Sequence, residues 1–263
     1  MNTTKSNKSA LSLIVAIMIL LSIIPVNLYT SIDTNAATNG FHVSGTKILD
    51  GNNQQFVMRG VNIAHAWFKS NTKTSINAIA ARGGNTVRVV CSDGEQWTKT
   101  TQTELQNIIS WCKDAKVICV LEVHDGTGKN DVSYLNNAAN YWVEMKSVLQ
   151  GNEDYVIVNI ANEWYGSWNN ATAWANGYKS AIATIRDAGI TNMLMVDSAG
   201  YGQWPTSIFQ KGKEIFNSDS LKNTMFSIHM YQDAGKDEAT VKNNINLAKA
   251  LYKYGMTTEV IEG

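Results

Sequence analysis

The chain has 263 residues, of which 44% are hydrophobic and 17% are charged, so it is long enough to bury a substantial core. Its 22 Lys and Arg residues balance its 22 Asp and Glu residues, and a net charge of zero gives no reason to expect a nucleic acid or an anionic surface as a partner. With two prolines, no repeat and no low-complexity tract, the sequence argues against an internal linker.

The first 37 residues have the pattern of a secretory signal peptide. Lysines precede an apolar run from Leu11 to Val26, and Ala36-Ala37 supply small residues for cleavage. The alternative is a membrane anchor, because the run is only slightly shorter than a bilayer span. We expect residues 1–37 to be removed on export and residues 38–263 to form one domain of a secreted, extracellular protein that has no further contact with a membrane.

The three cysteines, Cys91, Cys112 and Cys119, are an odd number for an exported chain. Their spacing contains no C-x-x-C, so it indicates neither a zinc ribbon nor a thioredoxin-type redox motif. Two interpretations remain. The cysteines are small buried apolar residues, which we favour, or two of them form a disulfide and one is free.

A regular alternation of strand and helix patterns follows a hairpin predicted at 41–56. Strands are predicted at 56–62, 86–91, 117–124, 156–163, 193–198, 225–231 and 257–262. Helices are predicted between and after them at 76–83, 105–112, 135–149, 174–189, 203–216 and 241–255. This alternation predicts an α/β fold with a parallel sheet, either open and doubly wound or closed as a barrel. The open fold would carry a glycine-rich phosphate-binding turn, and neither G-x-G-x-x-G nor G-x-x-x-x-G-K-[ST] occurs.

The strand predicted at 156–163 is the most informative, because five of its eight residues are apolar and yet it ends in Asn162 and Glu163. A carboxylate and an amide at the end of a buried strand are costly unless they are paired or used. Polar residues also end most of the other predicted strands: Asn62, Arg88, His124 with Asp125, Ser198, His229 with Tyr231, and Glu262. Because the strands of a closed barrel present their carboxyl ends to one cleft, this distribution favours the barrel and a site at that end.

Glu163 and Glu262 are the predicted catalytic pair, at the ends of the fourth and seventh strands. Cleavage of a glycosidic bond needs an acid for the leaving oxygen and a carboxylate opposite it. By hypothesis, Arg88 holds the nucleophile ionised and Asn162 binds a sugar hydroxyl. Tryptophans in the predicted cleft loops offer apolar faces to sugar rings: Trp67, Trp97, Trp164, Trp168 and Trp204.

Other chemistries fit these residues less well. His124 and His229, each taken alone, are more typical of structural histidines than of catalysts or ligands. A metal site built from them and the nearby carboxylates lacks the H-E-x-x-H spacing, and no G-x-S-x-G elbow indicates a serine hydrolase. Trp111 and Trp142 lie on predicted helices and are expected in the core.

The sequence VIVNIANEWYG at 156–166 resembles the acid/base strand of glycoside hydrolase family 5. Five further motifs stand where that family has similar ones: FHVSGTKILDG at 41–51, MRGVN at 58–62, NTVRVV at 85–90, LEVHD at 121–125 and SIHMY at 227–231. Together they make the chain from Asn39 to Gly255 similar to the secreted bacterial β-mannanases of the family.

The resemblance implies a retaining, endo-acting hydrolase on a (β/α)8 TIM barrel, with a polysaccharide substrate and no cofactor or metal. It makes Glu163 the acid/base and Asn162 its sugar-binding neighbour. The other substrate-binding residues expected around them are Arg88, His124, His229, Tyr231, Trp67, Trp97 and Trp164. Overall likeness favours β-1,4-mannan, but no residue spacing separates mannan from cellulose, so a β-1,4-glucanase remains an alternative.

The last residues depart from the family pattern. The family's nucleophile motif has the form V-I-G-E-F-G, whereas residues 257–263 read TTEVIEG, so Glu262 is the expected nucleophile and Glu259 is the alternative. Seven strands can be read from the sequence, and roughly the last helix, strand and helix of the barrel are missing. We therefore expect a truncated barrel of marginal stability, and a non-catalytic polysaccharide-binding remnant is the second functional alternative.

Overall fold

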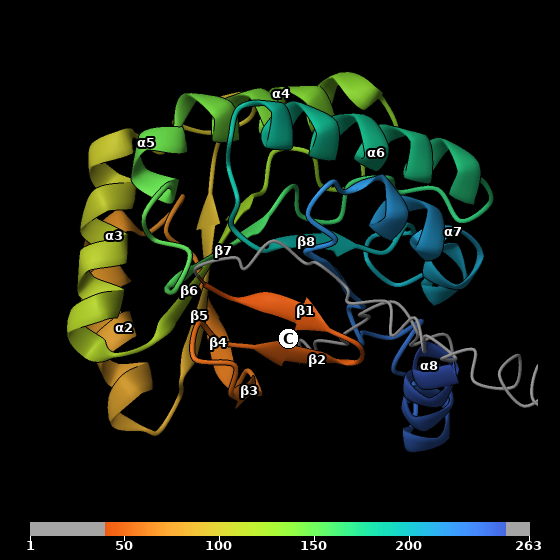
Figure 1. Ribbon diagram of the computed structural model, residues 1–263, viewed down its shortest axis with the longest axis horizontal. Coiled ribbons are helices and arrows are strands. Elements are labelled where there is room, and N and C mark those ends of the chain that lie inside the picture. Colours follow the sequence, from red (N-terminus) through yellow and green to blue (C-terminus); the bar gives the residue numbers. More distant parts are fainter. Residues whose placement is uncertain (1–39, 251–263) are drawn as a thin grey trace, which may run out of the picture. The chain divides into compact units, whose positions relative to one another are not determined.

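Six parallel strands run through the centre of the structure, a computed structural model that describes residues 40–250 (Figure 1). They are β4 (Gly60–Ile63), β5 (Thr86–Cys91), β6 (Ile118–Val123), β7 (Val156–Asn159), β8 (Leu194–Asp197) and β9 (Thr224–Ser227). Their order in the sheet is their order in the chain. A doubly wound sheet reverses its strand order at a switch point, whereas a barrel advances in one direction. The described strands therefore follow the barrel arrangement and not the open one.

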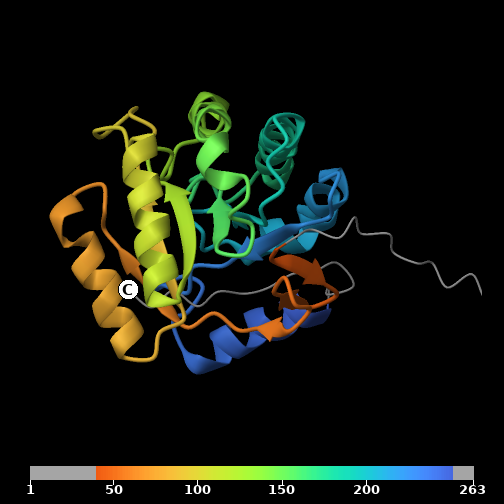
Figure 2. The same ribbon diagram turned by 60° about the vertical axis from the view of Figure 1, so that its left-hand side comes forward.

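A helix follows each of these strands, and in Figure 2 the helices from orange through yellow and green to lighter blue stand side by side, while the last, darkest blue helix lies apart from this row. They are η1 (Lys69–Asn71), α2 (Thr72–Ala81), α3 (Gln102–Ala115), α4 (Val132–Glu144), α5 (Lys146–Leu149), α6 (Ala171–Asp187), α7 (Pro205–Ser218) and α8 (Glu238–Ala250). Within residues 40–250, no helix combines the length and apolar character that crossing a membrane requires.

Side-chain caps fix where three of the helices begin. The Thr101 side chain accepts a hydrogen bond from the backbone of Glu104, whose carboxylate accepts one from Thr101 in return, so α3 starts with a capping box. Asp131 caps α4 and Asn170 caps α6 in the same way, each accepting from a backbone N–H of the first turn. These caps anchor the ends of the loops that leave β5, β6 and β7.

An antiparallel sheet of β1 (His42–Ser44), β2 (Lys47–Leu49) and β3 (Gln55–Phe56) closes the amino ends of the parallel strands, which confirms the predicted hairpin. The Phe41 N–H donates to the carbonyl of Glu153, just before β7, at 3.1 Å. Asn223, just before β9, accepts from the Val43 N–H at 3.1 Å and donates to the Phe41 carbonyl at 2.9 Å. Because both contacts lie at strand beginnings, the carboxyl ends are left open for a site.

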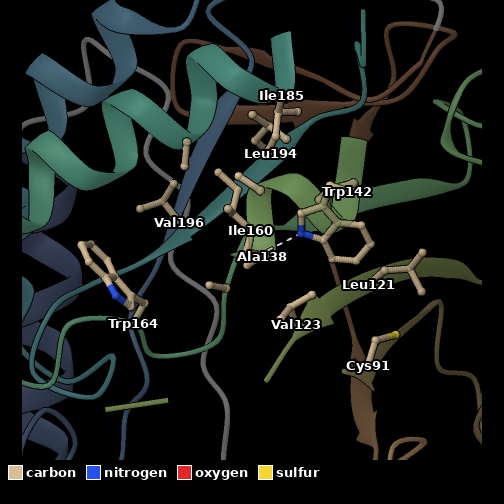
Figure 3. Packing of buried hydrophobic residues seen from close by; sticks show 14 of the residues in the cluster. Cys91, Leu121, Val123, Ala138, Trp142, Ile160, Trp164, Ile185, Leu194 and Val196 are labelled. Atoms are coloured by element: carbon tan, nitrogen blue, oxygen red, sulfur yellow. Dashed lines mark hydrogen bonds between the residues drawn. The ribbon is translucent and has the colours of Figure 1, made fainter. Parts of the chain in front are cut away.

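Side chains that point to the two faces of the sheet form two separate cores. On one face Val120, Ile157, Met195 and Met225 pack with Phe41, Val43 and Ile48 of the antiparallel sheet. On the other face a larger core lies between the strands and the helices, and Figure 3 shows part of it. Burial on both faces explains why the strands read as nearly continuous apolar runs.

Aromatic side chains from the helices satisfy carbonyl groups where the strands end. Trp142 Nε1 donates to the Ile160 carbonyl at 2.9 Å (Figure 3), and Trp174 Nε1 donates to that of Asp197 at 3.1 Å. The Tyr178 hydroxyl donates to the Ala161 carbonyl at 3.2 Å. These bonds fix α4 and α6 against the ends of β7 and β8, and they confirm Trp142 as a core residue.

Several predicted boundaries were wrong. The strand predicted at 56–62 is interrupted between Phe56 and Gly60, and Gly60 lies so close to the Thr86 carbonyl oxygen that a Cβ there would approach it to 1.8 Å. The strand predicted at 156–163 ends at Asn159, and the helix predicted at 135–149 divides at Met145. The seventh predicted strand, at 257–262, and the predicted signal peptide lie outside the described residues.

The three cysteines are buried and free, which confirms the favoured interpretation of small apolar core residues. Burial raises the pKa of Cys91 and Cys119 well above the ordinary value for a thiol. Both thiols therefore stay protonated and have little nucleophilic character.

The close packing around Gly177, in the middle of α6, predicts that a larger residue there destabilises the fold. A Cβ at this position would lie 2.3 Å from the Trp164 ring, so Gly177→Ala is expected to destabilise the fold by about 1–3 kcal/mol, although alanine is the better helix former. The measurement is thermal unfolding next to Gly212→Ala in α7, where the nearest atom is 3.1 Å away and belongs to the Ile208 side chain. Equal melting temperatures for the two variants would contradict the predicted close contact.

Candidate active site

A cleft of about 520 Å³ opens at the carboxyl ends of the parallel strands. Eight of the residues that the sequence singles out line it: Asn62, Trp67, Arg88, His124, Asn162, Glu163, His229 and Tyr231. Tyr201 and Gln203 add further polar and aromatic groups to the wall. The parallel sheet thus brings together residues that are up to 169 positions apart in the chain, from Asn62 to Tyr231.

Arg88 lies in the floor of the cleft and is almost fully buried. One terminal nitrogen donates to Asn159 Oδ1 at 2.6 Å and to Asn162 Oδ1 at 2.8 Å, while the other lies 3.4 Å from Glu122 Oε1. A buried guanidinium is tolerated only when its donors are satisfied. Arg88 therefore fixes the orientation of Asn162, whose amide nitrogen donates to Thr127 Oγ1 at 2.8 Å.

Glu122 connects this layer to His124. The Glu122 side chain is fully buried in β6, and its Oε1 lies 2.9 Å from His124 Nδ1. Burial alone lowers the pKa of His124, but the charge of Glu122 and its hydrogen bond outweigh burial and raise that pKa above its ordinary value. His124 is therefore held as a donor at the cleft wall, with its ring orientation fixed from below.

Trp67 and Trp97 flank the His124 ring. The Trp67 ring centroid lies 5.1 Å from that of His124 and 5.3 Å from that of Trp97, both edge to face. Trp67 is 42% exposed and lines the cleft, whereas Trp97 is half-buried and stands behind it. Asp125 accepts from the Gln96 N–H at 2.7 Å and so fixes the loop that carries Trp97. Trp97 is not among the residues that line the cleft, and its predicted contact with substrate stays a prediction.

Glu163 extends into the cleft from a strained backbone. Its φ of 48° is left-handed, which is uncommon for a residue other than glycine. Its N–H donates to Asp197 Oδ2 at 2.9 Å, and its carbonyl accepts from the Gly128 N–H at 3.0 Å. The carboxylate Oε1 lies 2.7 Å from His229 Nδ1. This bend, four residues after the end of β7, turns the Glu163 carboxylate towards the cleft.

His229 lies between two carboxylates. Its Nδ1 faces Glu163, and its Nε2 is 3.3 Å from Asp197 Oδ2. Burial alone lowers the pKa of His229, but the charge of Asp197 and the bonds to Asp197 and Glu163 outweigh it and raise that pKa to about 9. Conversely, burial alone raises the pKa of Asp197, while His229, Arg88 and the Glu163 N–H lower it to about 2. At neutral pH the imidazole is therefore charged and donates to Glu163 Oε1.

The loop after β8 forms the wall beside His229. Gly200, Tyr201 and Gly202 are left-handed in succession, with φ values of 65°, 57° and 72°. The Gly202 carbonyl accepts from the His229 N–H at 2.8 Å, and a Cβ on Gly202 would lie 2.6 Å from the His229 ring. Only glycine allows the loop this close. The loop presents Tyr201, 46% exposed, to the cleft.

Trp164 does not lie in the cleft, so its prediction as a substrate-binding residue was wrong. Figure 3 shows the side chain among the buried residues, and it is 1% exposed. Its Nε1 donates to the Asp131 carbonyl at 3.0 Å, and the ring packs against Gly177 and Tyr178. The chain turns at Glu163, so the next side chain points outward to α6. Trp168 and Trp204 flank Gly200, and Glu262 and Glu259 lie outside the described residues.

Comparisons with known proteins identify the family. Residues 49–258 match the family described as Cellulase (glycosyl hydrolase family 5). The chain belongs to this family. It is 54% identical over 207 residues to a mannan endo-1,4-beta-mannosidase of Salipaludibacillus agaradhaerens, covering 79% of this chain and 67% of the relative. It is 43% identical over 207 residues to one of Cellvibrio japonicus (strain Ueda107), covering 78% of this chain and 48% of the relative.

Solved structures of the family have the same fold. The crystal structure of a beta-mannanase from Streptomyces thermolilacinus with mannohexaose superposes with a TM-score of 0.78 at 38% identity, over 85% of this chain and 73% of the other. The described strands of this family 5 chain are therefore part of a (β/α)8 barrel, as the sequence predicts. The chain spans about half to two thirds of the length of its curated relatives.

Sequence reasoning missed three buried polar residues of the family 5 site, Glu122, Asn159 and Asp197. Each is fully buried inside a strand and contributes to the network around Arg88. A signal was present, because each interrupts an apolar run, and a charged or amide side chain is seldom buried without a partner. Among the described residues, no three or more His, Cys, Asp or Glu side chains form a group that could hold a metal ion.

Replacing Arg88 with lysine tests the buried layer. Lysine keeps the charge but cannot donate to Asn159, Asn162 and Glu122 together, so Arg88→Lys is expected to lower the free energy of unfolding by about 2 kcal/mol or more. Thermal and urea unfolding would measure the loss. The control is Arg82→Lys on the exposed end of α2, which is expected to change stability by less than about 0.5 kcal/mol. Equal stability of the two variants would refute the structural role of Arg88.

Proposed function

We propose that this chain is an endo-acting, retaining glycoside hydrolase that cleaves β-1,4-mannosidic bonds, with Glu163 as its general acid and base. The observation that carries the proposal is the Glu163 carboxylate, held in the cleft at the end of β7 beside Asn162. The named activity of relatives at 43–54% identity supports mannan as the substrate.

The contacts of Glu163 suggest how it would act. His229 donates to Oε1, so Oε2 is the oxygen left to exchange a proton with the substrate. In the first step, Glu163 gives this proton to the leaving glycosidic oxygen while a second carboxylate attacks the anomeric carbon. In the second step, Glu163 takes a proton from the water that releases the covalent sugar. Glu262 is the proposed second carboxylate, and Glu259 is its alternative.

The rest of the cleft matches a sugar chain. Trp67 and Tyr201 present aromatic surfaces, and Asn62, Asn162 and Gln203 offer amide groups between them. Sugar rings have apolar faces and polar edges, so this combination suits a polysaccharide. The geometry of the cleft does not distinguish a 2-hydroxyl of mannose from that of glucose, and the preference for mannan rests on the relatives.

Glu163→Gln is the first test of the activity. The variant is expected to lose hydrolysis of galactomannan by a factor of roughly 10³ or more, because glutamine cannot supply the proton. It should retain far more activity on a β-mannoside with an acidic phenol as leaving group, which departs without protonation. The control is the surface variant Glu214→Gln, expected to match the wild type. Reducing-sugar release and phenol absorbance would measure the two reactions.

Several outcomes would contradict the proposal. Faster hydrolysis of carboxymethyl cellulose than of galactomannan would favour the glucanase alternative. A folded wild type that adsorbs to insoluble mannan without releasing sugar would favour a non-catalytic binding protein. If Glu259→Gln abolishes turnover and Glu262→Gln does not, Glu259 is the nucleophile.

Export from the cell belongs to the same proposal. The apolar run at 11–26 supports removal of residues 1–37 and release of the rest, because a polysaccharide too large to enter a cell must be cut outside it. After expression of the whole chain in a Gram-positive bacterial host, we expect the protein in the medium, with residues 1–37 removed by cleavage after Ala37. The intact mass of the secreted protein would measure the cleavage point, and retention of the uncleaved chain in the membrane fraction would favour an anchor.

A further inference from the structure

Asp197 has no contact with the cleft, yet it touches the groups that control Glu163. It is the last residue of β8, its side chain is fully buried, and it is not among the residues that line the cleft. An effect of Asp197 on the reaction must therefore pass through other residues.

The two oxygens of Asp197 collect donors from three other parts of the barrel. Oδ1 accepts from Asn159 Nδ2 at 3.0 Å, in β7. Oδ2 accepts from the Glu163 N–H at 2.9 Å, and it lies 3.3 Å from His229 Nε2 and 3.5 Å from a terminal nitrogen of Arg88. A buried carboxylate surrounded in this way has a fixed position, and it fixes its donors in turn.

The backbone of Glu163 is the first of these donors. Its left-handed φ of 48° is strained for a residue with a side chain, and such a conformation persists only where the surroundings enforce it. A charge-assisted bond from the Glu163 N–H to Asp197 supplies this constraint. The orientation of Glu163 towards the cleft therefore depends in part on the Asp197 side chain, 34 residues further along the chain.

The ring of His229 is the second group that Asp197 fixes, through an ion pair at 3.3 Å. With the Asp197 charge on Nε2, a neutral ring that kept its proton on Nδ1 would point a lone pair at a carboxylate, so the arrangement favours protons on both nitrogens. The pKa of His229, about 9, agrees with this geometry. The other titratable or charged groups that face Asp197 or His229 are Arg88 from β5, Glu163 after β7, Tyr178 from α6 and Tyr231.

We infer that Asp197 is a positioning residue for Glu163, acting by fixing the left-handed Glu163 backbone and by holding His229 as the charged donor to Glu163 Oε1. The inference rests on the proposed role of Glu163 as acid and base. Asp197, which lies outside the cleft, thus controls both the backbone conformation of Glu163 and the charge of the histidine that donates to it.

The test is Asp197→Asn, which preserves size and a carbonyl acceptor for the Glu163 N–H but removes the charge. The His229 ring is then expected to lose its proton at least one pH unit lower than in the wild type. Once His229 loses this proton, it no longer holds Glu163 Oε1 as a charged donor. The fall in kcat on galactomannan that follows the His229 titration should therefore move to lower pH by a similar amount. At roughly pH 8 a shift of one unit corresponds to a roughly twofold lower kcat, with little change in KM because Asp197 does not line the cleft.

The matched control is Asp219→Asn. Asp219 is also fully buried and charged, and it forms an ion pair with Arg186 at 2.9 Å. Its replacement removes a buried carboxylate of the same fold and should lower stability, but it should leave the His229 titration and the pH profile of kcat unchanged. Equal shifts in both variants would mean a general structural effect and would overturn the inference.

A direct titration separates this inference from the proposed hydrolysis. The chain has four histidines, and the ring signals of His229 can be assigned in NMR spectra by their loss in His229→Gln. In the wild type, His229 is expected to remain charged at roughly pH 8; titration near its ordinary pKa of about 6.5 would overturn the inference even if Asp197→Asn fails to fold. A wild type that shows the raised pKa and hydrolyses no mannan would refute the proposed function alone.

Discussion

The burial of the Arg88 guanidinium is the interaction on which the site depends. A permanent charge inside a parallel sheet is tolerated only when acceptors surround it, and here they come from three other strands or strand ends: Glu122, Asn159 with Asn162, and Asp197. This requirement fixes the relative positions of β5 to β8 at the carboxyl ends of the strands. The same acceptors then hold His124, His229 and Glu163, so the geometry of the cleft follows from the pairing beneath it.

The barrel separates stability from chemistry along the strand axis. At the amino ends, Val120, Ile157, Met195 and Met225 pack against apolar side chains of the antiparallel sheet of β1 to β3. Two residues further along three of these strands, the inward side chains become Glu122, Asn159 and Asp197. Alternate residues of a strand point to the same face, so a step of two residues leads from an apolar layer to a polar one. The cleft therefore rests on a polar layer that in turn rests on a packed core.

Backbone strain is concentrated around the proposed acid and base. Glu163 and Tyr165 are left-handed after β7, and Gly200 to Gly202 are left-handed after β8. Hydrogen bonds join the two loops, since the Gly200 N–H donates to the Tyr165 carbonyl at 2.8 Å and the Glu163 N–H donates to Asp197. Two neighbouring loops thus hold each other in conformations that neither sequence favours alone, and the result is a carboxylate aimed at the cleft with a histidine on one oxygen.

The sequence by itself determined the alternation of strands and helices, the hairpin, the limits of β5 with Arg88 inside it, and the position of Glu163, Asn162, His124 and His229 after strand ends. These features are local, because apolar periodicity and polar strand ends are visible in the sequence. It also predicted Trp164 in the cleft, where the turn at Glu163 sends the ring into the core. Only the tertiary structure decided that Asp197, Glu122 and Asn159 surround Arg88, because those contacts join residues 34 to 109 positions apart and depend on strand register, which no stretch of sequence displays.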